Sequence, residues 1–310
     1  MSIENQYFDD SIEAFDFLDS LAFSKTDFIF RGHKKEKYKL TTTLNRHIKI
    51  SQESWSSDID EMIDQFRVGL MKLGILPFES DRRIDWLEYA RHHGVPTPVL
   101  DFSYSPYMAL FFAFNGSRIN YNTKEKEYTV IYALNINKLA LLWATLPLNP
   151  EEECDEVMKR YNDFLYPKEE LFKDGFPDSW MQFIPFPGKY NTRMHLQQGA
   201  LLYDTLKYNS LNVENLDELI EKHKKPDTSL PDSGTEKSEP TLYKIFINKK
   251  CVSDIFAKLE LMGINGGFLY KNSDSVAQDV INSYNYNSKT SYLRDMRIPP
   301  PDDTKISRNH

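Results

Sequence analysis

The spacing of apolar residues predicts several amphipathic helices. In the segment 10–22, apolar residues recur every three or four positions behind Asp10 and Ser11, which is typical of a capped helix that buries one face. Similar spacing, with a glycine at or just beyond the last turn, predicts further helices over 58–74, 83–93 and 252–262.

Short β-branched and aromatic segments between these helices predict strands. They lie at 27–31, 128–134, 200–203 and 242–247. Pro96 and Pro98 exclude helix and favour extended backbone into 99–100. Residues 106–115 carry no charge and predict a buried helix, with Ser105 as its cap and Pro106 in its first turn. We therefore expect an α+β fold, with a mixed or antiparallel β core and flanking helices.

The helix and strand patterns weaken in three segments, which we expect to lie outside the regular core. We expect one domain over 1–290. Within it, 147–190 is rich in prolines and acidic residues and predicts an irregular excursion with a helix near 151–165. The polar, Pro- and Ser-rich run at 222–240 predicts a flexible surface loop, and 291–310 predicts a polar tail.

Composition excludes several classes of protein. The 310 residues include only two cysteines, Cys154 and Cys251, without metal-ligand or disulfide spacing, so we expect no metal. The first residues lack a signal-peptide pattern and no apolar run could span a bilayer, so we expect a cytoplasmic protein without a membrane partner. A net charge of −8 argues against nucleic-acid binding by bulk electrostatics, although basic residues gather at 31–39.

Four stretches carry a family resemblance. They are FRGH at 30–33 with YKLTTTLNR at 38–46, WLEYARHHGVPTPVLDFSYSPYMALFFAFN at 86–115, RMHLQQGALLY at 193–203, and LYKIFI at 242–247 with IFAKLELMGI at 255–264. Together they resemble the FRG domain family, which is named for its Phe-Arg-Gly motif. Family members more often have glutamine where Arg91 stands, arginine where Pro98 stands, and Trp-Thr where Phe102-Ser103 stands.

The layout of these stretches is also similar to the arginine-serine-glutamate layout of ADP-ribosyltransferases. That resemblance implies a split β-sandwich that binds NAD as a substrate. It implies that Arg31 contacts a diphosphate or ribose and that Ser103 braces the nicotinamide ribose. The substrate-binding residues would be Phe30, Arg31, Gly32, His92 and His93, and the catalytic residues Asp101, Ser103, Gln197 and Gln198. Gly32 is expected to leave room for the ligand.

Three functions remain open from the sequence. The first is a nucleotide-binding FRG domain protein that acts as an NAD-dependent ADP-ribosyltransferase on a protein or nucleic acid, as a toxin in bacterial stress or phage defence. In that case Asp101 or Asp204 must replace the motif glutamate. The second is a non-catalytic module that recognises a nucleotide or partner, in which Arg31 could equally pair with Asp101. The third is a nuclease that uses His92, His93 and Asp101.

Overall fold

The computed structural model describes residues 2–24, 27–47, 55–117, 126–146, 154–167, 181–185, 192–204, 215–223 and 239–285. In this part of the chain, seven strands form one sheet in the order β1-β7-β4-β2-β3-β6-β5. β1 pairs with β7 in parallel, and the other neighbouring pairs are antiparallel. The strands are β1 (Ile3–Phe8), β2 (Phe28–His33), β3 (Val99–Ser103), β4 (Tyr128–Asn135), β5 (Met181–Ile184), β6 (Gly199–Asp204) and β7 (Leu242–Asn248).

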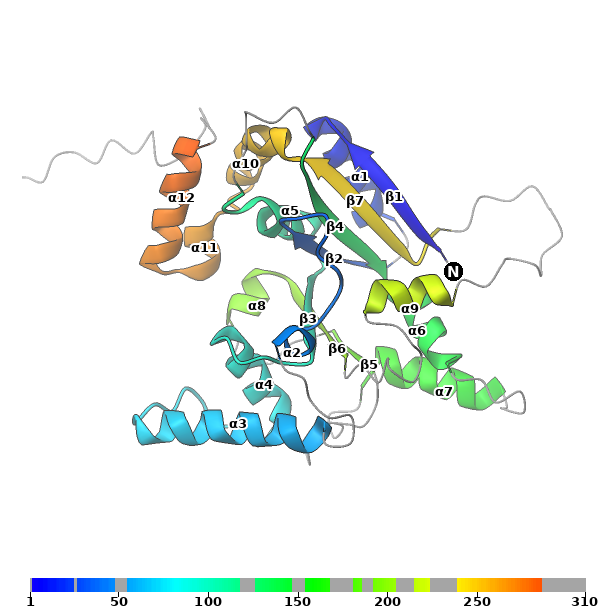
Figure 1. The fold of residues 1–310 in the computed structure, drawn as a ribbon, viewed down its shortest axis with the longest axis vertical. Helices are drawn as coiled ribbons and strands as arrows, with labels where there is room; N and C mark the ends of the chain where they lie inside the picture. Colours follow the sequence, from blue (N-terminus) through cyan, green and yellow to red (C-terminus); the bar gives the residue numbers. More distant parts are fainter. Residues whose placement is uncertain are drawn as a thin grey trace, which may run out of the picture.

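Helices cover both faces of this sheet (Figure 1). They are α1 (Ser11–Ala22), α2 (Thr43–His47), α3 (Trp55–Lys72), α4 (Arg83–His92), α5 (Pro106–Phe114), α6 (Ile136–Ala144), α7 (Cys154–Leu165), α8 (Thr192–Leu196), α9 (Leu216–Lys222), α10 (Val252–Leu261), α11 (Gly266–Tyr270) and α12 (Ser273–Asn285), with a short 3₁₀ turn, η3 (Lys249–Cys251), before α10. The expected α+β class with a mixed sheet and flanking helices is confirmed.

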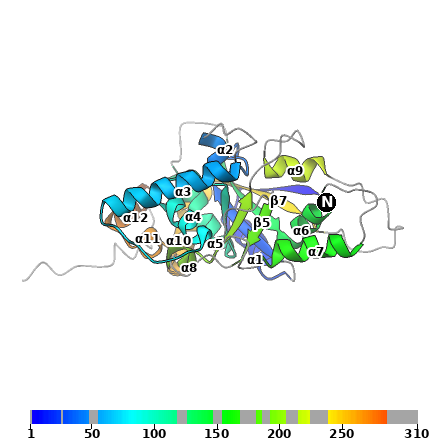
Figure 2. The same cartoon turned by 90° about the horizontal axis from the view of Figure 1, so that it is seen from below.

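The two-residue period of the strands divides the core between the two faces. In β4, Val130 and Tyr132 pack with helices α6, α7 and α9 on one face, whereas Ile131 and Ala133 pack with α1, α5 and α10 on the other. A third cluster joins α3 and α4 to β3 and β6. In both views α3 lies on one side of the short strands β5 and β6, and α7 lies on the other (Figures 1 and 2).

The two halves of the sheet meet at a single point. β2 and β3 share only one residue pair, Phe30 with Ser103, whereas β2 and β4 are paired over six residues from Phe28 to His33. Beyond Phe30 the two strands separate. Hydrogen bonds join all the described strands in one sheet. This arrangement does not confirm the finer expectation of an ADP-ribosyltransferase-like split β-sandwich, which stays a prediction.

Most predicted elements form close to their expected bounds. Asp10 caps α1 as expected, since its carboxylate accepts hydrogen bonds from the backbone N–H groups of Ile12 and Glu13, at 2.8 and 3.1 Å. Ser105 occupies the N-cap position of α5 as expected, but its side chain makes no capping hydrogen bond. Pro106 is the first residue of this helix, where the missing backbone N–H of proline costs nothing.

The stretch 147–190 is only partly as expected. The structure describes α7 close to the predicted helix near 151–165, and it also describes β5, which was not predicted and pairs with β6 at the edge of the sheet. Most of the expected loop at 222–240 and all of the tail at 291–310 lie outside the described residues. Among the described helices, none is long and apolar enough to cross a membrane.

Candidate ligand-binding cavity

A cavity of about 370 Å³ opens where β2 and β3 separate. It lies between these strands and the helices α4, α8 and α11, so it draws on chain segments more than two hundred residues apart. Its described lining consists of Phe30, Arg31, Gly32, Thr43, Arg91, His92, Gly94, Val95, Asp101, Phe102, Ser103, Phe112, Arg193, Met194, Gln197 and Tyr270. The volume is within the range of about 300–1,000 Å³ that small-molecule sites occupy.

Arg31 bridges the gap between the separating strands. Its Nη1 donates a hydrogen bond to the backbone carbonyl of Asp101 at 2.5 Å, at a point where a strand partner would otherwise donate. Its Nε donates to Nε2 of His33 at 2.8 Å. These two bonds fix the plane of the guanidinium group and leave Nη2, within the described residues, for a ligand.

His33 supports Arg31 as a neutral ring. Nε2 accepts from Arg31, so the proton of the neutral ring lies on Nδ1, 3.3 Å from the carbonyl oxygen of Tyr38. Burial and the adjacent Arg31 lower the pKa of His33 to about 3. Burial also lowers the pKa of Arg31 to about 10, which still leaves it cationic at neutral pH.

Asp101 is held by two arginines. Arg91 binds its carboxylate through both Nε and Nη2, while Nη1 of Arg91 donates to the Thr97 hydroxyl at 3.1 Å. Arg31 Nη1 lies 4.0 Å from Oδ2 of the same carboxylate. Burial raises the pKa of Asp101, but the charges of Arg91 and Arg31 outweigh it, so the net pKa is below its usual value.

Arg193 and Gln197 extend into the cavity from the opposite side. They are four residues apart, and the N–H of Gln197 donates to the carbonyl of Arg193 at 3.0 Å, so the two residues share one face of the α8 turn. The guanidinium of Arg193 lies over the Tyr270 ring, 4.2 Å from its centre. Gln197 is only 7% exposed. Within the described residues, Nε of Arg193 and Nε2 of Gln197 are buried without a hydrogen-bond partner.

The cavity is cationic, whereas the chain as a whole has a net charge of −8. Three guanidinium groups against one carboxylate give the described lining a net charge of about +2. Burial, opposed by the charge of Asp101, lowers the pKa of His92 to about 4, so this ring is neutral at pH 7. The exposed Arg46 on α2 is close enough to lower the pKa of Arg31 further. An anion is the ligand that this charge favours.

Ser103 acts as a structural clamp at the edge of the cavity. Its hydroxyl donates to the carbonyl of Gln197 at 2.7 Å and accepts from the backbone N–H of Ser105 at 2.9 Å. These bonds tie the end of β3 to the turn after α8. The hydroxyl therefore positions Gln197, and its only proton is already donated.

Gly32 is required by packing within the protein. A Cβ at this position would lie 1.9 Å from the carbonyl oxygen of Ala109 on α5. The glycine therefore allows α5 to approach β2, and the space that it leaves is filled by the helix backbone. This differs from the expectation that Gly32 makes room for a ligand, although the residue does border the cavity.

The structure brings most of the predicted site residues together. Those that line the cavity are Phe30, Arg31, Gly32, His92, Asp101, Ser103 and Gln197. His93 and Gln198 are exposed and do not line it. His93 packs against Tyr89 instead, with ring centres 4.5 Å apart, because adjacent residues on a helix point in different directions.

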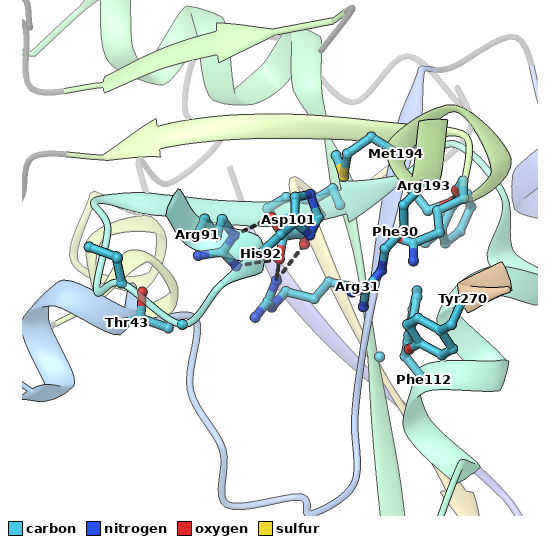
Figure 3. A pocket seen from close by; sticks show the side chains of 16 residues that line it. Phe30, Arg31, Thr43, Arg91, His92, Asp101, Phe112, Arg193, Met194 and Tyr270 are labelled. Carbon is cyan, nitrogen blue, oxygen red and sulfur yellow. Dashed lines mark hydrogen bonds and ion pairs between the residues drawn. The ribbon is translucent and has the colours of Figure 1, made fainter. Parts of the chain in front are cut away.

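Sequence reasoning missed four important members of the lining. Figure 3 shows Arg91 and Arg31 converging on Asp101, with Arg193 and Tyr270 across from them. Arg91 was considered only as a departure from the family pattern. Arg193 could have been found, because it stands four residues before Gln197. Phe112 lies in the stretch 86–115 but carries no signal of its own, and nothing local marks Tyr270, which reaches the site through tertiary packing.

No group of three or more His, Cys, Asp or Glu side chains that could hold a metal ion occurs within the described ranges. The three residues that a nuclease would use are also separated. His92 borders the cavity with Asp101, whereas His93 does not.

The fold and this cavity define a class of protein: a single-sheet α+β domain with a cationic cavity between two diverging strands. Residues 26–122 match the model of the FRG domain, so the chain contains an FRG domain. The match includes Phe30-Arg31-Gly32 and the stretch 86–115, whereas 193–203 and 242–264 lie outside it. No curated protein and no solved structure matches the chain.

Proposed function

We propose that the cavity binds a phosphate-bearing nucleotide, with NAD as the first candidate. The observation that carries this proposal is the excess of unused hydrogen-bond donors in a cationic pocket. Arg193 Nε and Gln197 Nε2 are buried without a partner among the described residues. Buried donors of this kind are costly unless a ligand or water satisfies them. A ligand that is rich in acceptors and negative charge is complementary to such a lining.

Arg31 is the proposed phosphate contact. A planar guanidinium keeps its charge when buried and can present paired donors to phosphate oxygens. The His33 and Asp101 bonds hold this group in place before a ligand arrives, which lowers the entropic cost of binding. Arg91 is less suited to the role, because its donors are already bound to Asp101 and Thr97.

ADP-ribosyl transfer to a protein or nucleic acid is the catalytic form of the same proposal. The acceptor would form a bond to C1′ of the nicotinamide ribose as nicotinamide leaves, and the acceptor would lose a proton. Asp101 is the only carboxylate in the described lining that could stabilise positive charge at C1′, since the buried Asp204 does not border the cavity. Its bidentate bond to Arg91 reduces that capacity and favours recognition without turnover.

Calorimetric titration with NAD and ADP tests the binding proposal. We expect saturable binding to the wild-type protein and a loss of about tenfold or more in affinity for Arg31→Gln, because one charge-assisted contact is removed. Lys250→Gln is the matched control, since it removes an exposed cation that does not border the cavity. Absence of binding to the wild type, or equal losses in the two variants, would refute the proposal.

Incubation with NAD labelled on its adenylate part separates transfer from recognition. Label on protein or nucleic acid in a cell extract, lost in Asp101→Asn, supports the transferase form. A role in bacterial stress or phage defence depends on that form, and growth arrest on induced expression is its expected sign. Binding of NAD without any transfer of label supports the recognition module.

A further inference from the structure

The amide of Gln197 stands out among the polar groups of the cavity. The residue is only 7% exposed, and Nε2 is buried with no partner among the described residues. The backbone of the same residue is fully engaged, because its N–H donates to Arg193 and its carbonyl accepts from Ser103. The side chain is thus fixed at its base, and Nε2 of its amide remains available to donate to a ligand in the cavity.

Flat side chains line the same cavity as this amide. Tyr270 and Phe112 border the cavity, and the Arg193 guanidinium stacks on the Tyr270 ring at 4.2 Å. Figure 3 shows these three side chains grouped on one side of the cavity, away from the cluster of Arg91, Arg31 and Asp101. The cavity therefore has a charged end and a planar end. Aromatic rings and stacked guanidinium groups favour planar ligand groups.

We infer that the planar end is the subsite for a ring whose edge presents one hydrogen-bond acceptor beside one donor, and that Gln197 reads this edge. A primary amide offers one donor and one acceptor in a plane, which is the complement of such an edge. Glutamine recognises adenine through two parallel hydrogen bonds of this kind. A carboxamide substituent, as on nicotinamide, presents the same pair of groups.

This inference rests on the proposed function and adds a specificity-determining residue to it. The phosphate would lie at Arg31 and the ring at Gln197, which gives the bound ligand a direction. Arg193 Nε, also buried and unpartnered among the described residues, can donate to a second acceptor on the same ring or its ribose.

Two pairs of ligands test the inference, because each pair differs at one donor group. The first pair is AMP and purine riboside 5′-monophosphate, which lacks the 6-amino group. The second is nicotinamide mononucleotide and nicotinate mononucleotide, in which the carboxamide is a carboxylate. In at least one pair, we expect the wild-type protein to bind the amino or amide member about tenfold more tightly. The preferred pair identifies the source of the ring.

Gln197→Met is the decisive variant, since methionine has a similar length and no amide. We expect it to lose the preference while it keeps its affinity for inorganic pyrophosphate, which shows that the fold and the Arg31 end are intact. If nucleotides bind through Arg31 without preference in either pair, or if the preference survives in Gln197→Met, the inference is wrong and the binding function stands. If no nucleotide binds the wild type, both are wrong.

Discussion

The carboxylate of Asp101 compensates two largely buried guanidinium groups at once. It forms a bidentate bond with Arg91, whose side chain is 10% exposed, and lies near Arg31, whose side chain is 16% exposed. Asp101 itself keeps 39% of its side chain exposed, so water and ligand can reach it. This arrangement makes the carboxylate a structural counter-ion that also borders a binding site.

At the residue scale, we predict that Asp101→Asn destabilises the protein by about 2 kcal/mol, because Arg91 loses its anionic partner. This is below the ~3–5 kcal/mol for breaking a fully buried pair, since the aspartate is partly exposed. Urea unfolding of Asp101→Asn, Arg91→Gln and the double variant measures the coupling. Strictly additive losses in the double variant would contradict the ion pair.

Two adjacent glutamines, Gln197 and Gln198, have different environments. Gln198 has a left-handed backbone with φ of 48° and is exposed, whereas Gln197 lies in the cavity. The sequence predicts that both amides reach the site, but the rotation of the short α8 turn brings only Gln197 to it. That rotation depends on the hydrogen bond from Ser103 across 94 residues of chain. Local sequence patterns cannot predict a contact between residues so far apart in the chain.

At the scale of elements, contact between β2 and α5 positions Arg31. We predict that Gly32→Ala destabilises the protein by about 3 kcal/mol or more, because the added Cβ overlaps the Ala109 carbonyl, 1.9 Å away, and the backbone must move. Gly69→Ala is the matched control. Gly69 lies in α3 with nothing within 4 Å of the added Cβ, so alanine should stabilise the helix by about 0.5–1 kcal/mol.

These two changes are compared by chemical denaturation in the same buffer. Equal effects of the two alanine substitutions would show that β2 and α5 do not pack as described.

The planar end of the cavity depends on a second contact between elements. The carboxylate of Asp279 on α12 accepts hydrogen bonds from the backbone N–H groups of Gly266 and Gly267, at 2.9 and 2.7 Å. These bonds anchor the start of α11, which carries Tyr270. We predict that Asp279→Ala lowers stability by about 1–3 kcal/mol, because one buried and one half-buried N–H group lose their acceptor.

The same variant should weaken nucleotide binding more than pyrophosphate binding, since Arg31 is untouched. Asp254→Ala, which removes an exposed carboxylate from the first turn of α10, serves as the control and should change neither affinity. Calorimetry with both ligands makes the comparison, and an equal loss for nucleotide and pyrophosphate would contradict a separate planar end.

The elements that the sequence predicts are those with a strong local signal. The uncharged segment 106–115 becomes the buried helix α5, and Asp10 begins α1. β1 was missed because it is a largely exposed strand whose one partner among the described strands is β7, 239 residues further along the chain for Ile3 and Leu242. In the site, the strand-end Arg31 and the 101–103 segment were predicted, whereas Tyr270 and Arg91 were not, since only the folded chain brings them there.

At the scale of the whole molecule, the half-buried His33 and His92 make stability depend on pH. Burial lowers the pKa of His33 to about 3 and that of His92 to about 4, both below the ordinary value of 6.5. Between 6.5 and these lower values, the unfolded chain binds protons that the folded protein does not. Stability therefore falls as the pH is lowered, by up to ~1.4 kcal/mol per pH unit for each histidine.

Asp101 adds to this loss only at lower pH. Its net pKa is below the ordinary value of 3.8, so the stability that it contributes above that value is lost as the pH falls through the folded pKa. We predict that urea unfolding at pH 7 and pH 5 shows a clear loss for the wild type. His33→Gln should reduce that loss by about 1–2 kcal/mol. An unchanged difference would mean that the folded protein does not hold His33 as a neutral ring.

The central claim is that the gap between β2 and β3 is a nucleotide site with its phosphate at Arg31. A crystal structure of the wild-type protein grown with ADP tests it most directly. We expect a phosphate oxygen about 3 Å from the Arg31 guanidinium and the adenine ring on the side of Gln197 and Tyr270. Diphosphate density at any other surface, with the cavity holding only water, would contradict it.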